Sequence, residues 1–426
     1  MSLTNQPINQ STTKLTIGLF GFGVVGKGLY DVLHTTTLLN ATIKKICIRS
    51  SQKKRSISAE HFTTDATELL NDESINVIVE LIDDADAAFE IVKTALQKGK
   101  AVVSANKKMI ATHFRELLSL QKEYNSAFLY EAACCGSIPI IRNLEEYYDN
   151  DLLKAVKGIV NGSTNYILTK IADENLSFNE ALLNAQQLGF AESNPTLDIK
   201  GYDAVNKLTI LTLHSFGVLH KPTDLIFNGI DSITTQDSLY AKEKNLEIKL
   251  VAQAKRLDGG KLAALVLPQF IKANDDLYSV KNEFNALITE SSFADKQFFK
   301  GKGAGAFPTA AAVLSDIAAL RYNYRYEYKK VQDGNDTRLT NDYYLKVYAG
   351  SDDITKIEER DFEWIEERRI DYHYNSIIGV IHAQKLFNNN WWKEDGVSLI
   401  LCSDPIIDSI NREVDNVNEL EIIYND

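Results

Sequence analysis

The sequence lacks the features that mark membrane, nucleic-acid-binding and exported proteins. No apolar run reaches the roughly 18 residues that span a bilayer, and residues 1–13 are polar, unlike a signal peptide. Basic residues are outnumbered, 46 against 58 acidic ones, and the net charge of −12 argues against nucleic-acid or anionic-membrane partners. We therefore expect a cytoplasmic protein that acts on a small molecule.

Cysteine is also scarce. The four cysteines have no zinc-site spacing, and adjacent Cys134 and Cys135 could not pair with each other without strain. We interpret them as reduced thiols. With 426 residues, 44% of them hydrophobic, the chain can bury a sizeable core in about two or three domains.

The first third of the chain alternates two hydrophobic periods. Residues 15–21 are strand-like, residues 24–33 have helical spacing, and residues 43–48 are again strand-like. The same alternation continues through residues 75–82, 85–97 and 101–104. It predicts βαβ units, and thus an α/β fold with a doubly wound parallel sheet in residues 1–139.

The remainder mixes helical and strand patterns. Helical spacing over residues 177–187 and 203–214, with a strand-like run at 262–267, predicts a separate α+β domain over residues 140–332. The composition changes at Asp333, which begins a turn-rich boundary. Strand-like runs at 343–348, 377–382 and 397–402, with a helix expected from Asp404, predict a small α+β domain over residues 333–426.

A glycine-rich loop, GFGVVG, lies between the first strand and the first helix. Gly21 would allow a tight turn, Gly23 would allow a pyrophosphate to approach the backbone, and Gly26 would allow close helix–strand packing. An ordinary glycine turn is the alternative. In this strand–turn–helix context the loop predicts a Rossmann-type dinucleotide site formed by Gly21, Phe22, Gly23, Val24, Val25 and Gly26.

The end of the second strand bears on which nicotinamide cofactor fits. An acidic residue there would bind a free ribose hydroxyl, but this chain has Arg49, followed by Ser50, Lys53, Lys54 and Arg55. The positive charge favours the 2′-phosphate of NADP(H) over NAD(H). A solvated basic loop is the alternative interpretation.

Three further polar or glycine-rich segments are candidates for chemistry. Lys107 follows the strand at 101–104, at the sheet edge where ligands bind; it is either a surface charge or a group that orients a substrate oxygen. Asp203 and Lys207 share one helix face, as an ordinary ion pair or as a carboxylate for a substrate ammonium beside a proton-carrying lysine. The glycine-rich run 301–309 precedes an Ala-rich helix and either approaches a flat ligand or merely leads into the helix.

Taken together, these segments resemble the homoserine dehydrogenase family over about residues 15–320. The similar segments are GFGVVG, VVSANKK, YEAACCGSIPII, KGIVNGSTNYILTK, LGFAESNPTLDIKGYDAVNKL and GAGAFPTAAAVLSDI, in that order. The family interconverts L-homoserine and L-aspartate 4-semialdehyde with NAD(P), in threonine, methionine and isoleucine biosynthesis. Another amino-acid or semialdehyde dehydrogenase of this fold, or a non-catalytic nucleotide sensor, is the rival interpretation.

The resemblance implies roles for individual residues. Lys207 matches the proton donor and acceptor, and Lys107 matches a lysine near both substrate and nicotinamide. The substrate-binding positions match Gly189, Glu192, Asp198 and Asp203, and further cofactor contacts are expected at Ser104 and Gly305.

The resemblance also implies a site for Na⁺ or K⁺, made mainly of backbone oxygens at Glu131, Cys134, Gly136 and Ile138. The chain departs from the family here, because Cys134 and Cys135 replace a valine and a glycine. If Cys135 needs a positive φ, the loop must be strained or reshaped. Ser163 and Asn194 are milder departures, from a threonine and an aspartate.

The ends of the chain suggest its organisation. The dinucleotide fold begins near the amino end, which implies the monofunctional form of the enzyme without a kinase. Residues 333–426 are expected to form a divergent ACT-type domain, and threonine inhibition is the hypothesis that follows. The resemblance further implies a homodimer through the middle domain.

Overall fold

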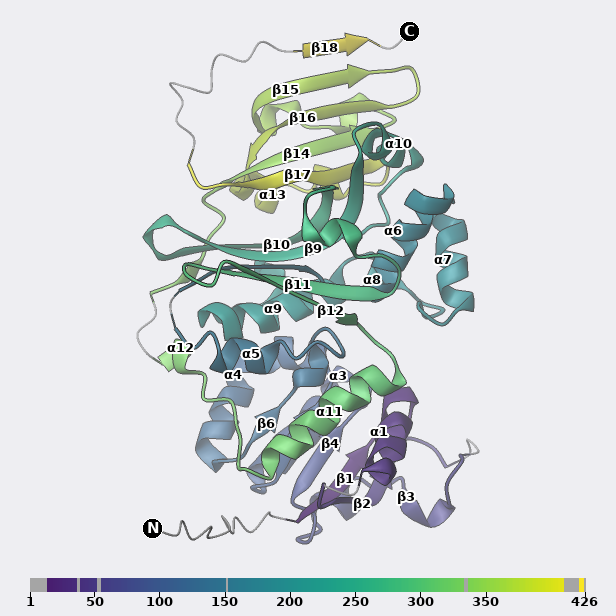
Figure 1. The fold of residues 1–426 in the computed structure, drawn as a ribbon, viewed down its shortest axis with the longest axis vertical. Helices are drawn as coiled ribbons and strands as arrows, with labels where there is room; N and C mark the ends of the chain where they lie inside the picture. The colour runs from purple at the N-terminus through teal and green to yellow at the C-terminus, as the bar shows by residue number, and fades with distance from the viewer. Residues whose placement is uncertain are drawn as a thin grey trace, which may run out of the picture. The chain divides into compact units, whose positions relative to one another are not determined.

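The computed structural model describes residues 14–36, 39–51, 55–150, 152–332, 336–409 and 421–424. The chain forms two compact units, and Figure 1 shows their elements. Unit 1 comprises Met1–Met109, His113–Ala133 and Gly305–Glu327, and unit 2 comprises Ile110–Thr112, Cys134–Ala304 and Tyr328–Asp426. No helix in the described part is long and apolar enough to cross a membrane.

Unit 1 contains the predicted parallel sheet, with strand order β3-β2-β1-β4-β5-β6. Its strands are β1 (Leu15–Phe20), β2 (Ala41–Cys47), β3 (Phe62–Thr63), β4 (Val77–Glu80), β5 (Ala101–Ser104) and β6 (Phe128–Leu129). The crossover helices are α1 (Val24–Thr35), α2 (Thr67–Leu70), α3 (Ala85–Gln97) and α4 (Lys107–Tyr124). Because the strands are parallel, their carboxyl ends lie along one edge of the sheet.

Helix α3 shows why the sequence pattern predicted this unit well. The Asp84 side chain accepts hydrogen bonds from the backbone N–H groups of Asp86 and Ala87, at 3.1 and 3.0 Å, and so caps the first turn. Beyond the last turn, Gly99 adopts a left-handed φ of 70°. Phe89 and Val92 are buried on the face toward the core. The observed limits are those that the sequence predicted.

Helix α11 (Ala306–Leu320) belongs to unit 1 although it is far along the chain, and Figure 1 shows it beside α1. The two helices can approach this closely because Gly28 has no side chain. A Cβ at this position would lie only 2.7 Å from the Ala306 carbonyl oxygen. The division into units therefore differs from the predicted limits, which placed residues 305–327 with the middle domain. The division by role, with a catalytic middle part and a regulatory end, stays a prediction.

Unit 2 is built around a large mixed sheet with strand order β12-β11-β7-β9-β10-β17-β14-β16-β15-β18. Its first strands are β7 (Leu153–Ile159), β8 (Ile226–Phe227), β9 (Leu246–Leu257), β10 (Lys261–Lys272), β11 (Phe284–Ser291) and β12 (Lys296–Lys302). The later strands are β13 (Arg338–Leu339), β14 (Tyr344–Ser351), β15 (Phe362–Ile370), β16 (Asn375–His382), β17 (Val397–Ile407) and β18 (Glu421–Tyr424). The helices are α5 (Ile141–Glu146), α6 (Gly162–Glu174), α7 (Phe178–Gln187), α8 (Thr196–Ile199), α9 (Tyr202–Phe216), α10 (Thr235–Glu243), α12 (Lys329–Gln332) and α13 (Ala383–Asn388).

The carboxyl-terminal strands have the neighbour order β17-β14-β16-β15, and each of these pairs is antiparallel. This is the order of a split β-α-β-β-α-β sheet. Short 3-10 turns, η6 (Ile354–Lys356) and η7 (Glu359–Asp361), stand where such a fold has its first helix. Val347, Leu399 and Trp392 are buried in the core of this part.

One expectation for this region is wrong. Asp404 does not begin a helix, because Ile406 and Ile407 continue the pairing of β17 with β14. Strand β15 carries acidic residues whose charge its arginines offset: Arg369 lies 2.6 Å from Glu367. Predictions for Lys53, Lys54 and the turn Asp333, Gly334 and Asn335 fall outside the described residues.

Candidate active site

The glycine loop of unit 1 has the geometry of a phosphate-binding turn. Gly21 adopts a φ of 93°, and a Cβ there would lie 2.5 Å from the Leu81 carbonyl oxygen. A Cβ at Gly26 would collide with the Gly21 carbonyl oxygen, whereas one at Gly23 would meet nothing within 4 Å. Gly23 therefore leaves open space at the start of α1, where no side chain caps the helix. Unpaired N–H groups at a helix start are suited to phosphate.

Next to this loop, the carboxyl ends of β4 and β5 carry a buried polar pair. Ser104 Oγ donates to Glu80 Oε2 at 2.5 Å, and the Ile82 N–H donates to Glu80 Oε1 at 2.7 Å. Burial raises the pKa of Glu80 to about 7, although both hydrogen bonds oppose the shift. Glu80 is the charged residue of a strand-like run that is otherwise mostly apolar, and sequence reasoning assigned it no role. Ser104, an expected cofactor contact, is fully buried.

Lys107 is the first residue of α4, directly beyond β5, and its side chain is partly exposed. The Asn106 side chain accepts a hydrogen bond from the Met109 N–H at 2.9 Å, and its amide donates to the Ile82 carbonyl at 3.0 Å. These contacts fix the turn that carries Lys107. The structure thus places Lys107 on the same sheet edge as the glycine loop.

A pocket of about 440 Å³ lies at the ends of β2 and β3, lined by residues that include Arg55, Phe62 and Thr63. The Arg55 guanidinium lies over the Phe62 ring at 5.1 Å and donates to the Ser50 carbonyl at 2.9 Å. Arg49 is exposed just beyond β2. The aromatic ring and the guanidinium group of this pocket, with the charge of Arg49 at the end of β2, suit a nucleotide that carries an extra phosphate.

In unit 2, α9 brings Asp203 and Lys207 together as the spacing predicted. Lys207 Nζ donates to Asp203 Oδ2 and to the Val160 carbonyl, both at 2.7 Å. The two residues are only 5% and 7% exposed, so this is a buried pair and not a surface one. A buried pair requires well-placed partners, because desolvation opposes both charges.

Asn161 supplies such a partner, and sequence reasoning missed it. Its Nδ2 donates to Asp198 Oδ1 at 2.7 Å and to Asp203 Oδ2 at 2.8 Å, so one amide bridges two expected substrate carboxylates. Its Oδ1 accepts from the Thr164 N–H at 2.8 Å and caps α6. The only local signal was a residue suited to helix capping before an apolar helix.

The other expected substrate residues lie on the segment between α7 and α9. Gly189 has a φ of 75°, and Glu192 is exposed. Ser163 Oγ donates to the Phe190 carbonyl at 2.5 Å, which connects this segment to the first turn of α6. Asn194 Oδ1 accepts from Thr196 Oγ1 at 2.7 Å, so the turn before α8 forms without an aspartate.

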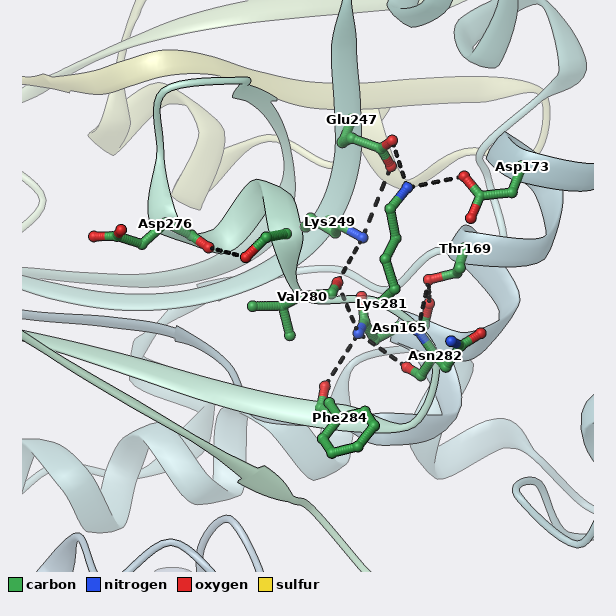
Figure 2. A network of polar contacts seen from close by, with 11 residues as sticks. Asn165, Thr169, Asp173, Glu247, Lys249, Asp276, Val280, Lys281, Asn282 and Phe284 are labelled. Carbon is green, nitrogen blue, oxygen red and sulfur yellow. Dashed lines mark hydrogen bonds and ion pairs between the residues drawn. The ribbon is translucent and has the colours of Figure 1, made fainter.

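Helix α6 is itself held by a polar network that runs from buried Lys249 and Asn165 to exposed Asp173, which Figure 2 shows from close by. Lys281 Nζ donates to Glu247 Oε1 at 2.6 Å and to Asp173 Oδ1, near the end of α6, at 2.9 Å. Lys249 Nζ donates to the Val280 carbonyl at 2.9 Å, and burial lowers the pKa of Lys249 to about 8. Asn165 Nδ2 donates to that same carbonyl at 3.2 Å. The network anchors the body of α6, whereas the contacts of Asn161, the N-cap of this helix, are made outside the network.

The cysteine loop has a left-handed backbone, with φ values of 56° at Cys135 and 54° at Gly136, so the condition stated for a strained loop is met at Cys135. A Cβ at Gly136 would lie 2.5 Å from the Lys302 carbonyl oxygen, and the Ser137 N–H donates to that oxygen at 3.0 Å. The described residues hold no group of three or more His, Cys, Asp or Glu side chains suited to a metal. The candidate cation ligands of this loop are backbone carbonyl oxygens, the ligand type that hard cations prefer.

The glycine run 301–309 divides into two roles. Gly303 packs against the Asn285 side chain, with which a Cβ would collide. Gly305 has a φ of 128° and precedes the first turn of α11 without a side-chain cap. Gly303 is therefore explained by protein packing, and Gly305 remains an expected cofactor contact.

Comparisons with known proteins agree with this geometry. A family model described as homoserine dehydrogenase matches residues 139–318, and its NAD binding domain model matches residues 21–131. The homoserine dehydrogenase of Bacillus subtilis (strain 168) is 36% identical over 320 residues, which cover 73% of this chain and 74% of the relative. That of Helicobacter pylori is 37% identical over 314 residues, covering 72% and 74%.

Solved structures show the same likeness. A homoserine dehydrogenase from Thiobacillus denitrificans superposes with a TM-score of 0.79 at 28% identity, covering 92% of this chain and 98% of that one. A hyperthermophilic archaeal homoserine dehydrogenase mutant in complex with NADPH gives a TM-score of 0.63 at 27% identity, covering 74% and 100%. The chain therefore belongs to the homoserine dehydrogenase family of oxidoreductases.

Proposed function

We propose that Lys207 is the proton carrier of the homoserine dehydrogenase reaction in this chain and that NADP(H) is its preferred cofactor. The observation that carries the first claim is the burial of the Lys207 amine against Asp203 and the Val160 carbonyl. A lysine that merely solubilised the surface would not be held in this way.

In the reducing direction, bound NADPH supplies a hydride to the aldehyde carbon of aspartate semialdehyde. The Lys207 ammonium donates a proton to the oxygen that becomes the alcohol, and in the reverse direction the neutral amine removes that proton. Asp203, Asp198 and Glu192 bind the substrate ammonium, and Gly189 gives their segment its left-handed turn. Lys107 orients a substrate oxygen near the nicotinamide.

Three observations support the cofactor assignment. The open space at Gly23 and the uncapped start of α1 suit a pyrophosphate. The Arg55 and Phe62 pair offers a platform for the adenosine end, and exposed Arg49 offers a charge to a 2′-phosphate. The relative with NADPH bound is a homologous precedent for this cofactor.

Three accessory features complete the proposal. The carbonyl groups of Glu131, Cys134, Gly136 and Ile138 are proposed as ligands of Na⁺ or K⁺, with oxygen as the donor. We also propose a homodimer through the middle domain, residues 140–332, and a regulatory role, with threonine as the candidate effector, for residues 333–426. Their split β-α-β-β-α-β strand order supports the ACT-type interpretation.

A matched pair of glycine variants tests the cofactor site. Gly23→Ala should raise the KM for NADPH at least about tenfold while leaving the melting temperature unchanged, because the new Cβ meets only open space. Gly99→Ala, at a φ of 70°, should lower the melting temperature without changing that KM. Comparing NADPH with NADH in the wild type tests the preference; a clear NADH preference would refute the role given to Arg49.

A further inference from the structure

Asn285 is a fully buried residue of β11 that the sequence analysis did not single out. In the ladder between β11 and β7, its neighbour Ala286 pairs with Ile159, which places Asn285 beside Val160. Asn285 Nδ2 donates to the Val160 carbonyl at 2.9 Å. Asn285 and Val160 are 125 positions apart in the chain, so no local sequence pattern predicts their contact.

The Val160 carbonyl also accepts the Lys207 amine, at 2.7 Å. A carbonyl oxygen has two lone pairs, so Asn285 and Lys207 together use both. The other acceptor of the lysine amine, Asp203 Oδ2, is likewise held by an amide, that of Asn161 at 2.8 Å. Each of these two acceptors is therefore fixed by one asparagine.

The orientation of the Asn285 amide is determined by Gly303 and by the Val160 carbonyl, both of which it contacts. A Cβ at Gly303 would collide with the Cγ, Oδ1 and Nδ2 atoms of Asn285, so the amide lies against bare backbone. Rotating the amide by half a turn would set Oδ1 against the Val160 carbonyl, and two acceptors repel. Oδ1 has no hydrogen-bond partner among the described residues, which makes Nδ2 the atom that fixes the side chain.

We propose that Asn285 is a positioning residue for the reaction: it holds the Val160 carbonyl, which in turn holds the Lys207 amine, and Gly303 leaves room for its amide. This inference rests on the proposed role of Lys207 as proton carrier. Displacing a reacting group by about 1 Å can lower a rate by about a hundredfold. Asn285 therefore acts on turnover without contacting substrate or cofactor.

Asn285→Asp is the primary variant, because it keeps the shape of the side chain and replaces the donor with an acceptor. Turnover should fall about 10- to 100-fold, with the KM for NADPH unchanged. Gly303→Ala should have the same effect, since its Cβ displaces the amide. Wild-type turnover in the folded Asn285→Asp protein would overturn the inference.

Asn165 offers a matched control. It is also buried, its Nδ2 donates to the backbone carbonyls of Val280, Asn282 and Phe284, as Figure 2 shows, and its Oδ1 likewise has no partner among the described residues. Asn165→Asp should lower the melting temperature while changing turnover per folded molecule by less than about twofold. Equal losses of turnover in the Asn165 and Asn285 variants would indicate a general structural effect and contradict the inference.

A double variant separates positioning from a merely structural role. Because Asn285 acts through Lys207, adding Asn285→Asp to Lys207→Met should change turnover by less than about twofold. A further loss equal to that of Asn285→Asp alone would overturn the inference. If Lys207→Met by itself kept normal turnover, the proposed function would fail first, so the two failures are distinguishable.

Discussion

The bridging amide of Asn161 gives a prediction whose size follows from its contacts. Asn161→Ala removes two hydrogen bonds to carboxylates, at 2.7 and 2.8 Å, together with the cap of α6. A hydrogen bond to a charged group contributes about 1.5–3 kcal/mol, and a helix cap about 0.5–2 kcal/mol. Without the amide, the carboxylates of Asp198 and Asp203 lose the hydrogen-bond donor that they share.

We therefore expect Asn161→Ala to raise the KM for homoserine about 10- to 100-fold, the equivalent of one such hydrogen bond, and to lower the melting temperature. Steady-state kinetics with saturating NADP⁺ and calorimetry measure the two effects. Asn161→Asp keeps the capping oxygen but adds a negative charge beside two others, so it should recover part of the stability and none of the affinity.

Ser177 provides the control for the capping contribution alone. It caps the neighbouring helix α7 in a capping box with Glu180. Ser177→Ala should cost about 1 kcal/mol of stability with the KM for homoserine unchanged. The reasoning is refuted if Asn161→Ala leaves that KM at the wild-type value, or if Ser177→Ala raises it as much.

Three further predictions concern pH, cofactor choice and the substrate segment. Burial raises the pKa of Glu80 from 4.5 to about 7 in the folded chain. Between those two pH values the unfolded chain has lost the proton that the folded chain keeps, so the free energy of unfolding falls as the pH rises. Glu80→Gln should consequently raise the melting temperature at about pH 8 and hardly at about pH 4; an equal gain at both would contradict the assignment. Arg49→Glu should shift the ratio of kcat/KM for NADPH over NADH at least about tenfold toward NADH, and an unchanged ratio would count against Arg49. Gly189→Ala, at a φ of 75° with open space around its Cβ, should cost about 1–2 kcal/mol of local strain and raise the KM for homoserine; an unaltered KM would show that the turn does not matter for substrate.

Hydrophobic periodicity was sufficient to predict the parallel sheet of unit 1, because its helices and strands alternate over short distances, but it did not predict that α11 belongs to the same unit. The Asp84 cap and the left-handed Gly99 delimit α3 locally, and the limits of α3 and β5 were predicted to the residue. The i, i+4 spacing likewise predicted that Asp203 and Lys207 share a face of α9.

The contacts that complete the site are not local, and this is why sequence patterns could not give them. Asn161 meets Asp203 from 42 positions away, and Asn285 meets Val160 from 125 positions away. Strand β17 continues past Asp404 because β14 offers it a partner, a tertiary effect that overrides the local helix signal. The burial of the Asp203 and Lys207 pair also depends on such packing, and it is this burial that distinguishes the pair from a surface ion pair.

The most direct test of the account compares two buried lysines of unit 2. Lys207→Met should lower turnover in both directions by about two to four orders of magnitude, with NADPH affinity nearly unchanged. Turnover is measured by NADPH absorbance, with aspartate semialdehyde as substrate in the reducing direction and homoserine in the oxidising direction. Lys249→Met removes a fully buried amine that donates to the Val280 carbonyl, and it should alter stability but not turnover per folded molecule. Near-normal turnover in a folded Lys207→Met protein would contradict the central claim that this amine carries the proton.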